Sequence, residues 1–147
     1  MALLLENEAL ICAKCRHELP LTQHHLNPNN YIAAKFYGVL PIEFCSAMLY
    51  FHKDGIVQNL VHQLKYKNKP EIGTLLGKWY AKELHKVAEN QNFSAIIPVP
   101  LHQKKLKERG YNQVTSFCEA LSVQLQIELK DQLLLRTAYS KTQTKKN

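Results

Sequence analysis

Residues 95–113 of this chain read AIIPVPLHQKKLKERGYNQ, and this stretch decides the predicted fold. Residues 95–100 are short and apolar, which predicts a buried strand. The strand ends at two prolines because proline cannot donate to a central ladder. A polar loop over 102–112 follows, and apolar spacing then predicts a helix from near Asn112 to Leu125. A strand that stops before a polar loop is a common place for a binding site in α/β proteins.

The same alternation of strand and helix patterns extends on both sides. The apolar runs 44–51 and 133–135 predict two further strands. Helical spacing of apolar residues predicts helices over 56–66 and from Pro70 to about residue 90, the second opened by a proline at its first turn. The order of elements therefore predicts an α/β fold with a mostly parallel sheet.

Loop-forming residues divide the chain into two parts. Residues 21–41 contain prolines, asparagines and a glycine without a sustained period. We therefore expect a small segment over 1–41 and a domain over 42–147. The chain has no apolar run long enough for a membrane span and no secretion signal at its start, so we expect a cytoplasmic protein.

Charge points to an anionic partner in the second part. The 147 residues carry a net charge of +7, and the excess lies in residues 61–147, whereas residues 1–60 are close to neutral. The polar loop holds Lys104, Lys105, Lys107 and Arg109 ahead of a helix start, an arrangement that suits a phosphate or pyrophosphate. A solvated basic surface explains the same composition equally well.

A cysteine pair near the start indicates metal or redox chemistry. Cys12 and Cys15 have the two-residue spacing that lets two thiolates reach one metal ion. Two thiolates do not complete a tetrahedral Zn²⁺ site, and His17, His24 and His25 are the candidates to fill it. Because this pair supplies only half of the thiolates of a zinc knuckle, we favour a chain in which it holds no metal ion.

The motifs together resemble the ComF family of competence-associated proteins, which join a zinc-ribbon-like N-terminus to a type I phosphoribosyltransferase domain. The resemblance covers most of the chain from residue 12 onward. The motifs that carry it are CAKCRHELP at 12–20, LKYK at 64–67, IPVPLH at 97–102, RGYNQ at 109–113 and TQT at 142–144.

This resemblance implies a fold and a set of site residues. The implied fold is the N-terminal part of a phosphoribosyltransferase-like parallel sheet, preceded by a partial zinc-ribbon-like knuckle. Thr142, Gln143 and Thr144 would begin a flexible loop, and Mg²⁺ would hold the leaving group of phosphoribosyl pyrophosphate. The substrate and its pyrophosphate would be bound by residues of segment 98–113, namely Pro98, Val99, Pro100, Leu101, His102, Lys104, Lys105, Arg109, Gly110, Tyr111, Asn112 and Gln113.

The chain departs from the family pattern at both ends. Only one cysteine pair is present, and the adjacent acids followed by Thr-Thr-Gly that bind phosphoribosyl pyrophosphate are missing. We therefore expect a truncated chain that is inactive as a transferase by itself, from a family linked to DNA uptake or nucleotide metabolism. The alternative is a non-catalytic module that binds single-stranded DNA or a protein of the competence machinery. It would use the basic half with aromatic residues such as Tyr66 and Tyr111.

Overall fold

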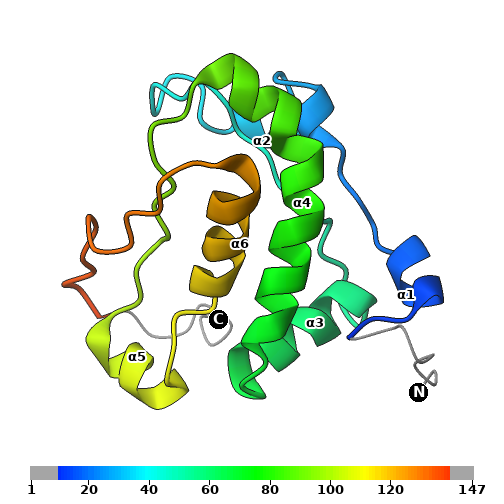
Figure 1. Ribbon diagram of the computed structural model, residues 1–147, viewed down its shortest axis with the longest axis vertical. Coiled ribbons are helices and arrows are strands. Elements are labelled where there is room, and N and C mark those ends of the chain that lie inside the picture. The colour runs from blue at the N-terminus through cyan, green and yellow to red at the C-terminus, as the bar shows by residue number, and fades with distance from the viewer. Residues whose placement is uncertain (1–9, 140–147) are drawn as a thin grey trace.

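The computed structural model describes residues 10–139, which fold around one long helix. Figure 1 shows this helix, α4, upright in the centre, with α6 beside it, α3 at its lower end, and α1 and α5 on opposite sides. The helices are α1 (Ala13–His17), the 3-10 helix η1 (His24–Leu26), α2 (Tyr31–Ala34), α3 (Ile56–Tyr66), α4 (Pro70–Gln91), α5 (Gln103–Arg109) and α6 (Thr115–Leu125).

The three longer helices confirm the predictions from apolar spacing. Helix α3 has the predicted bounds, and α4 begins at Pro70, where a missing N–H costs no hydrogen bond. Helix α4 ends where Asn92 adopts a left-handed backbone conformation. Helix α6 begins at Thr115, shortly after the predicted start at Asn112. Periodicity succeeded here because each of these helices buries one apolar face.

Helices α4 and α6 approach closely because glycines line the contact. A Cβ atom at Gly77 would lie 2.6 Å from the carbonyl oxygen of Phe117 and 2.8 Å from Cβ of Ala120. A Cβ atom at Gly73 would collide with the Ser116 hydroxyl. The two glycines, one turn apart, therefore let the backbone of α4 lie directly against α6.

Two small apolar clusters form the core along α4. One contains Leu19, Leu60 and Ile72, and joins the segment after α1 to α3 and the start of α4. The other contains Tyr80, Ala81 and Leu121, and joins the middle of α4 to α6. Helix α4 contributes to both clusters, so the remaining elements are positioned relative to it.

The predicted parallel-sheet α/β fold is wrong for residues 10–139, which are mostly helical and form no sheet. Segment 44–51 pairs only through Leu49, in an antiparallel bridge with Leu21. Segment 133–135 is exposed and unpaired within the described chain. Apolar runs of this length show that a segment is hydrophobic, but strand pairing also requires a neighbouring backbone in register.

Segment 95–100 forms a single parallel bridge rather than a strand. The Ile96 N–H donates to the Glu128 carbonyl at 2.8 Å, and the Lys130 N–H donates to the Ile96 carbonyl at 2.9 Å. Pro98 and Pro100 then remove the next donors from this stretch, so a ladder does not continue.

The predicted loop over 102–112 is also corrected, because residues 103–109 form α5. Its sequence, QKKLKER, consists of strong helix formers. No helix within residues 10–139 is long and apolar enough to cross a bilayer.

The α4–α6 contact predicts a stability effect at Gly77. Gly77→Ala places a methyl group against the Phe117 backbone, so we expect the free energy of unfolding to fall by about 1–3 kcal/mol in urea denaturation. We expect a net loss because the collision with the Phe117 backbone costs more than the roughly 1 kcal/mol that alanine gains over glycine in helix propensity. Gly73→Ala is the matched control, with a smaller loss, because the Ser116 hydroxyl has no hydrogen-bond partner and can rotate away. Unchanged or increased stability of Gly77→Ala would contradict this packing.

Candidate functional site

Helix α5 is a short basic helix with defined caps at both ends. His102 precedes it, and His102 Nδ1 accepts a hydrogen bond from the Lys104 N–H at 3.2 Å. Gly110 follows it with a φ of 78°, and its N–H donates to the Leu106 carbonyl at 2.8 Å. A positive φ favours glycine, so Gly110 ends α5 and turns the chain toward α6.

The RGYNQ motif holds α5 to its surroundings through side-chain hydrogen bonds. Arg109 donates to Gln113 Oε1 at 2.5 Å, and the buried Gln113 amide donates to the Tyr111 carbonyl at 3.2 Å. Asn112 donates to the Val99 carbonyl at 2.9 Å, which ties the motif back to the 95–100 segment. The amides of Asn112 and Gln113 thus fix the path of the chain.

Tyr111 connects this motif to α3. Its hydroxyl donates to the Leu64 carbonyl, which lies in the last turn of α3, where carbonyls lack a helical partner. Burial raises the pKa of Tyr111, and the negative charge of Glu71 adds to the increase. The neutral phenol is therefore the form that joins α3 to the RGYNQ motif.

Two exposed tyrosines lie next to cations at the ends of α5. The guanidinium carbon of Arg109 lies 5.5 Å from the ring centre of Tyr66, which is 56% exposed. Lys104 Nζ lies 5.5 Å from the ring centre of Tyr139, which is 47% exposed. The His102 ring meets Tyr139 edge-on at 5.2 Å. We call this region the basic–aromatic face; it comprises the residues in these contacts, Tyr66, His102, Lys104, Arg109 and Tyr139, and the lysines beside them in the sequence of α3 and α5, Lys65, Lys105 and Lys107.

The cations of the basic–aromatic face are not neutralised by ion pairs within the described part of the chain. None of its lysines, nor Arg109, forms an ion pair with a carboxylate of residues 10–139. Lys65, Lys104 and Lys107 are exposed, whereas Lys105 and Arg109 are half-buried. Exposed cations next to exposed aromatic rings suit a ligand that has both phosphates and planar bases.

The structure brings most of the predicted site residues into one region, but in different roles. Pro98 is buried, Pro100 and Leu101 are half-buried, and Val99 is 69% exposed. Thr142, Gln143 and Thr144 lie outside the described residues. Sequence reasoning missed Tyr139, because no local spacing signals a contact between Tyr139 and residues 102 and 104.

The cysteine pair lies at α1, which also contains His17, whereas the other predicted histidine ligands, His24 and His25, lie in η1. Cys12 Sγ accepts a hydrogen bond from the Cys15 N–H at 3.4 Å. A separate interaction with the Cys12 side chain raises the pKa of the Cys15 thiol, so this thiol stays protonated at neutral pH. His24 packs against Tyr50 and His25 against Tyr80. In the described part of the chain no three metal-binding side chains gather, so these residues do not fit a complete Zn²⁺ site.

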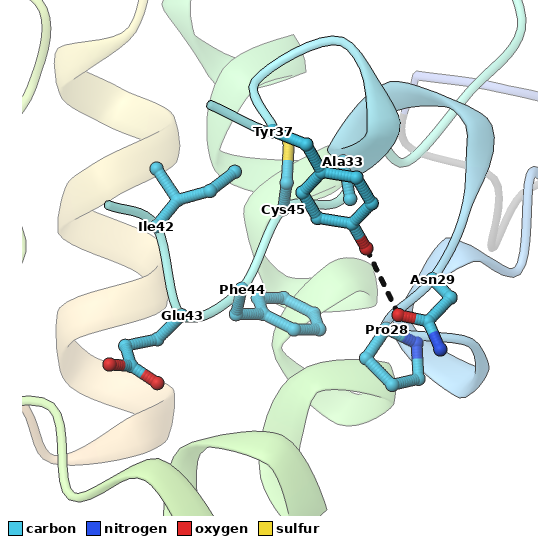
Figure 2. A pocket seen from close by; sticks show the side chains of 8 residues that line it. All are labelled: Pro28, Asn29, Ala33, Tyr37, Ile42, Glu43, Phe44 and Cys45. Atoms are coloured by element: carbon cyan, nitrogen blue, oxygen red, sulfur yellow. Dashed lines mark hydrogen bonds between the residues drawn. The ribbon is translucent and has the colours of Figure 1, made fainter. Parts of the chain in front are cut away.

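A hollow between α2 and residues 42–45 is too small to serve as the site. Figure 2 shows its lining, in which the Tyr37 hydroxyl donates to Asn29 Oδ1 at 3.0 Å across one side. Its volume is about 80 Å³, well below the several hundred Å³ of a ligand pocket. The residues around it are Pro28, Asn29, Ala33, Tyr37, Ile42, Glu43, Phe44 and Cys45.

Comparison with known proteins links the chain to proteins named for DNA use. It is 34% identical over 87 residues to "DNA utilization protein YhgH" of Escherichia coli O157:H7 and to the protein of the same name from Shigella flexneri. The Escherichia coli K12 protein of that name is 33% identical. Each match covers 57% of this chain and 38% of the relative, so the matched region spans less than half the length of those proteins. No family model and no solved structure matches.

The Tyr111 hydrogen bond predicts a stability effect with a defined pH dependence. Tyr111→Phe leaves the Leu64 carbonyl without this donor, so we expect a loss of about 1 kcal/mol in urea denaturation at neutral pH. Because the folded state raises the phenol pKa, the contribution is complete below the ordinary pKa of about 10 and is lost above the raised value. The variant's stability should therefore decline less steeply above pH 10.

Tyr37→Phe is the matched control for this measurement. Its hydroxyl donates to Asn29 on an exposed surface, so its removal should change stability by less than about 0.5 kcal/mol. Equal losses in both variants would show that the Tyr111 hydroxyl does not join α3 to the RGYNQ motif.

Proposed function

We propose that this chain serves DNA utilization by binding single-stranded DNA on the basic–aromatic face. The observation that carries the proposal is the pairing of Tyr66 with Arg109 and of Tyr139 with Lys104, all around one basic helix. The names of the similar proteins support a role with DNA.

The chemistry of the face matches a single strand better than a duplex. Bases of a single strand are free to stack on tyrosine rings, and each stack contributes about 1–3 kcal/mol with little sequence preference. Lysines of α5 and the end of α3 supply point charges for phosphates. The contacts made by Arg109 orient its guanidinium beside Tyr66 before a strand binds.

Affinity for a labelled oligothymidine, measured by fluorescence anisotropy, tests the proposal. Tyr66→Ala should weaken binding by about 1 kcal/mol or more, so that about a fifth of the affinity or less remains. Lys107→Gln should weaken binding modestly and reduce the slope of log affinity against log salt by about 0.7. An oligothymidine affinity that does not change with salt concentration, or that Arg109→Ala leaves unchanged, would contradict the proposal.

The chain provides a matched control for the tyrosine. Tyr31 is 61% exposed and lies 4.5 Å from Lys35 Nζ, in a cation–aromatic pair on α2, outside the face. Tyr31→Ala should therefore leave oligothymidine affinity unchanged. If Tyr31→Ala and Tyr66→Ala weaken binding equally, the interaction is not located on the basic–aromatic face.

The second candidate is binding of phosphoribosyl pyrophosphate with Mg²⁺ by segment 98–113. It is favoured by the cluster of Lys104, Lys105 and Arg109 on one short segment, together with the resemblance to the ComF family. Pyrophosphate binding needs cations but no exposed tyrosine. Thermal stabilisation by phosphoribosyl pyrophosphate and Mg²⁺ that is lost in Arg109→Ala but kept in Tyr66→Ala would favour this candidate over DNA binding.

A further inference from the structure

A second hollow lies on α4, on the side facing α1, whereas the basic–aromatic face includes α5 on the opposite side in Figure 1. Its volume is about 220 Å³. Helix α1 contributes Arg16, α4 contributes Trp79, Lys82 and Glu83, and the extended segments contribute Leu19, Leu21 and Met48. The hollow is thus formed by three parts of the chain that are distant in sequence.

The interior of this hollow is suited to a flat apolar group. Leu19, Leu21, Met48 and Trp79 provide apolar surface, and Leu21 is 42% exposed. A cavity of about 150 Å³ is enough to hold a benzene molecule. A volume of about 220 Å³ therefore accommodates one ring system, but it leaves a charged substituent outside at the rim.

The rim carries charges that select the rest of the ligand. Arg16 lies over the Trp79 ring at 4.6 Å, and neither Arg16 nor Lys82 forms an ion pair with any carboxylate of residues 10–139. Their positive charges are available to an anion. Oε2 of Glu83 lies 3.5 Å from His25 Nδ1, and the Glu83 carboxylate, a hydrogen-bond acceptor, also lines the hollow.

The charges and the apolar interior favour some classes of small ligand over others. Two cations and one carboxylate give the rim a net positive charge, which favours a ligand with net negative charge over a zwitterion. A hydrogen-bond acceptor beside an apolar floor favours a ring that bears N–H groups over a plain hydrocarbon ring. A nucleoside monophosphate with an amino-bearing base satisfies both requirements.

We propose that this hollow binds a nucleoside monophosphate. The base enters the apolar interior with an N–H directed to Glu83, and the phosphate meets Arg16 and Lys82. The site is separate from the basic–aromatic face and does not depend on DNA binding there.

Trp79 is the single tryptophan of the chain, so its fluorescence reports on this hollow. Titration of the full chain with deoxyadenosine monophosphate, excited where the nucleotide does not absorb, should change the emission in a saturable manner. Inorganic phosphate and phenylalanine should not, because the first lacks a ring and the second is a zwitterion. Failure of the nucleotide to saturate the signal, or an equal response to phenylalanine, would overturn the proposal.

Variants locate the response. Lys82→Gln should weaken deoxyadenosine monophosphate binding about fivefold, whereas Lys53→Gln, an exposed lysine that does not line the hollow, should leave it unchanged. Equal affinities of these two variants would overturn the assignment. Tyr66→Ala should bind the nucleotide like the unmodified chain even if it loses oligothymidine. Loss of both ligands in Tyr66→Ala would show that the hollow is not a separate site.

Discussion

The close contact between α4 and α6 is the constraint on which the rest of the structure depends. Gly73 and Gly77 have no side chains to separate the two helices, so α6 lies directly on α4. The RGYNQ motif lies just before α6, and the Thr115 N–H at the start of α6 donates to the Asn112 carbonyl at 3.0 Å. Its hydrogen bonds to Leu64 and Val99 then determine where α5 lies. A packing contact between helices thereby sets the position of a surface made largely of lysine and tyrosine.

The RGYNQ motif combines internal hydrogen bonds and an exposed cation–aromatic contact in adjacent residues. Tyr111, Asn112 and Gln113 direct their polar groups to other parts of the chain. Arg109 contacts both this internal network, through Gln113, and the exposed ring of Tyr66. In the proposed binding of DNA, this arrangement would reduce the entropy that Arg109 loses on binding, because its side chain is already held in place.

Local sequence was a good guide to helices and a poor guide to the sheet. The apolar stripes of α3, α4 and α6 occur within single segments, so their period could be recognised directly. Segment 95–100 was apolar enough to resemble a strand, but Ile96 pairs only with Leu129. Strand pairing depends on a distant segment, and nothing in a single apolar run specifies that partner. For α5, the abundance of lysine suggested a loop, although these residues are also strong helix formers.

The sequence by itself determined the three main helices, the concentration of positive charge after residue 60 and the residues of the RGYNQ motif. Only the tertiary structure decided that Tyr66 and Tyr139 lie beside cations at the two ends of α5. It also decided that Arg16, Trp79 and Lys82 border one hollow. The physical reason is that charge and helical period are properties of neighbouring residues, whereas both surfaces join residues that are brought together by packing on α4.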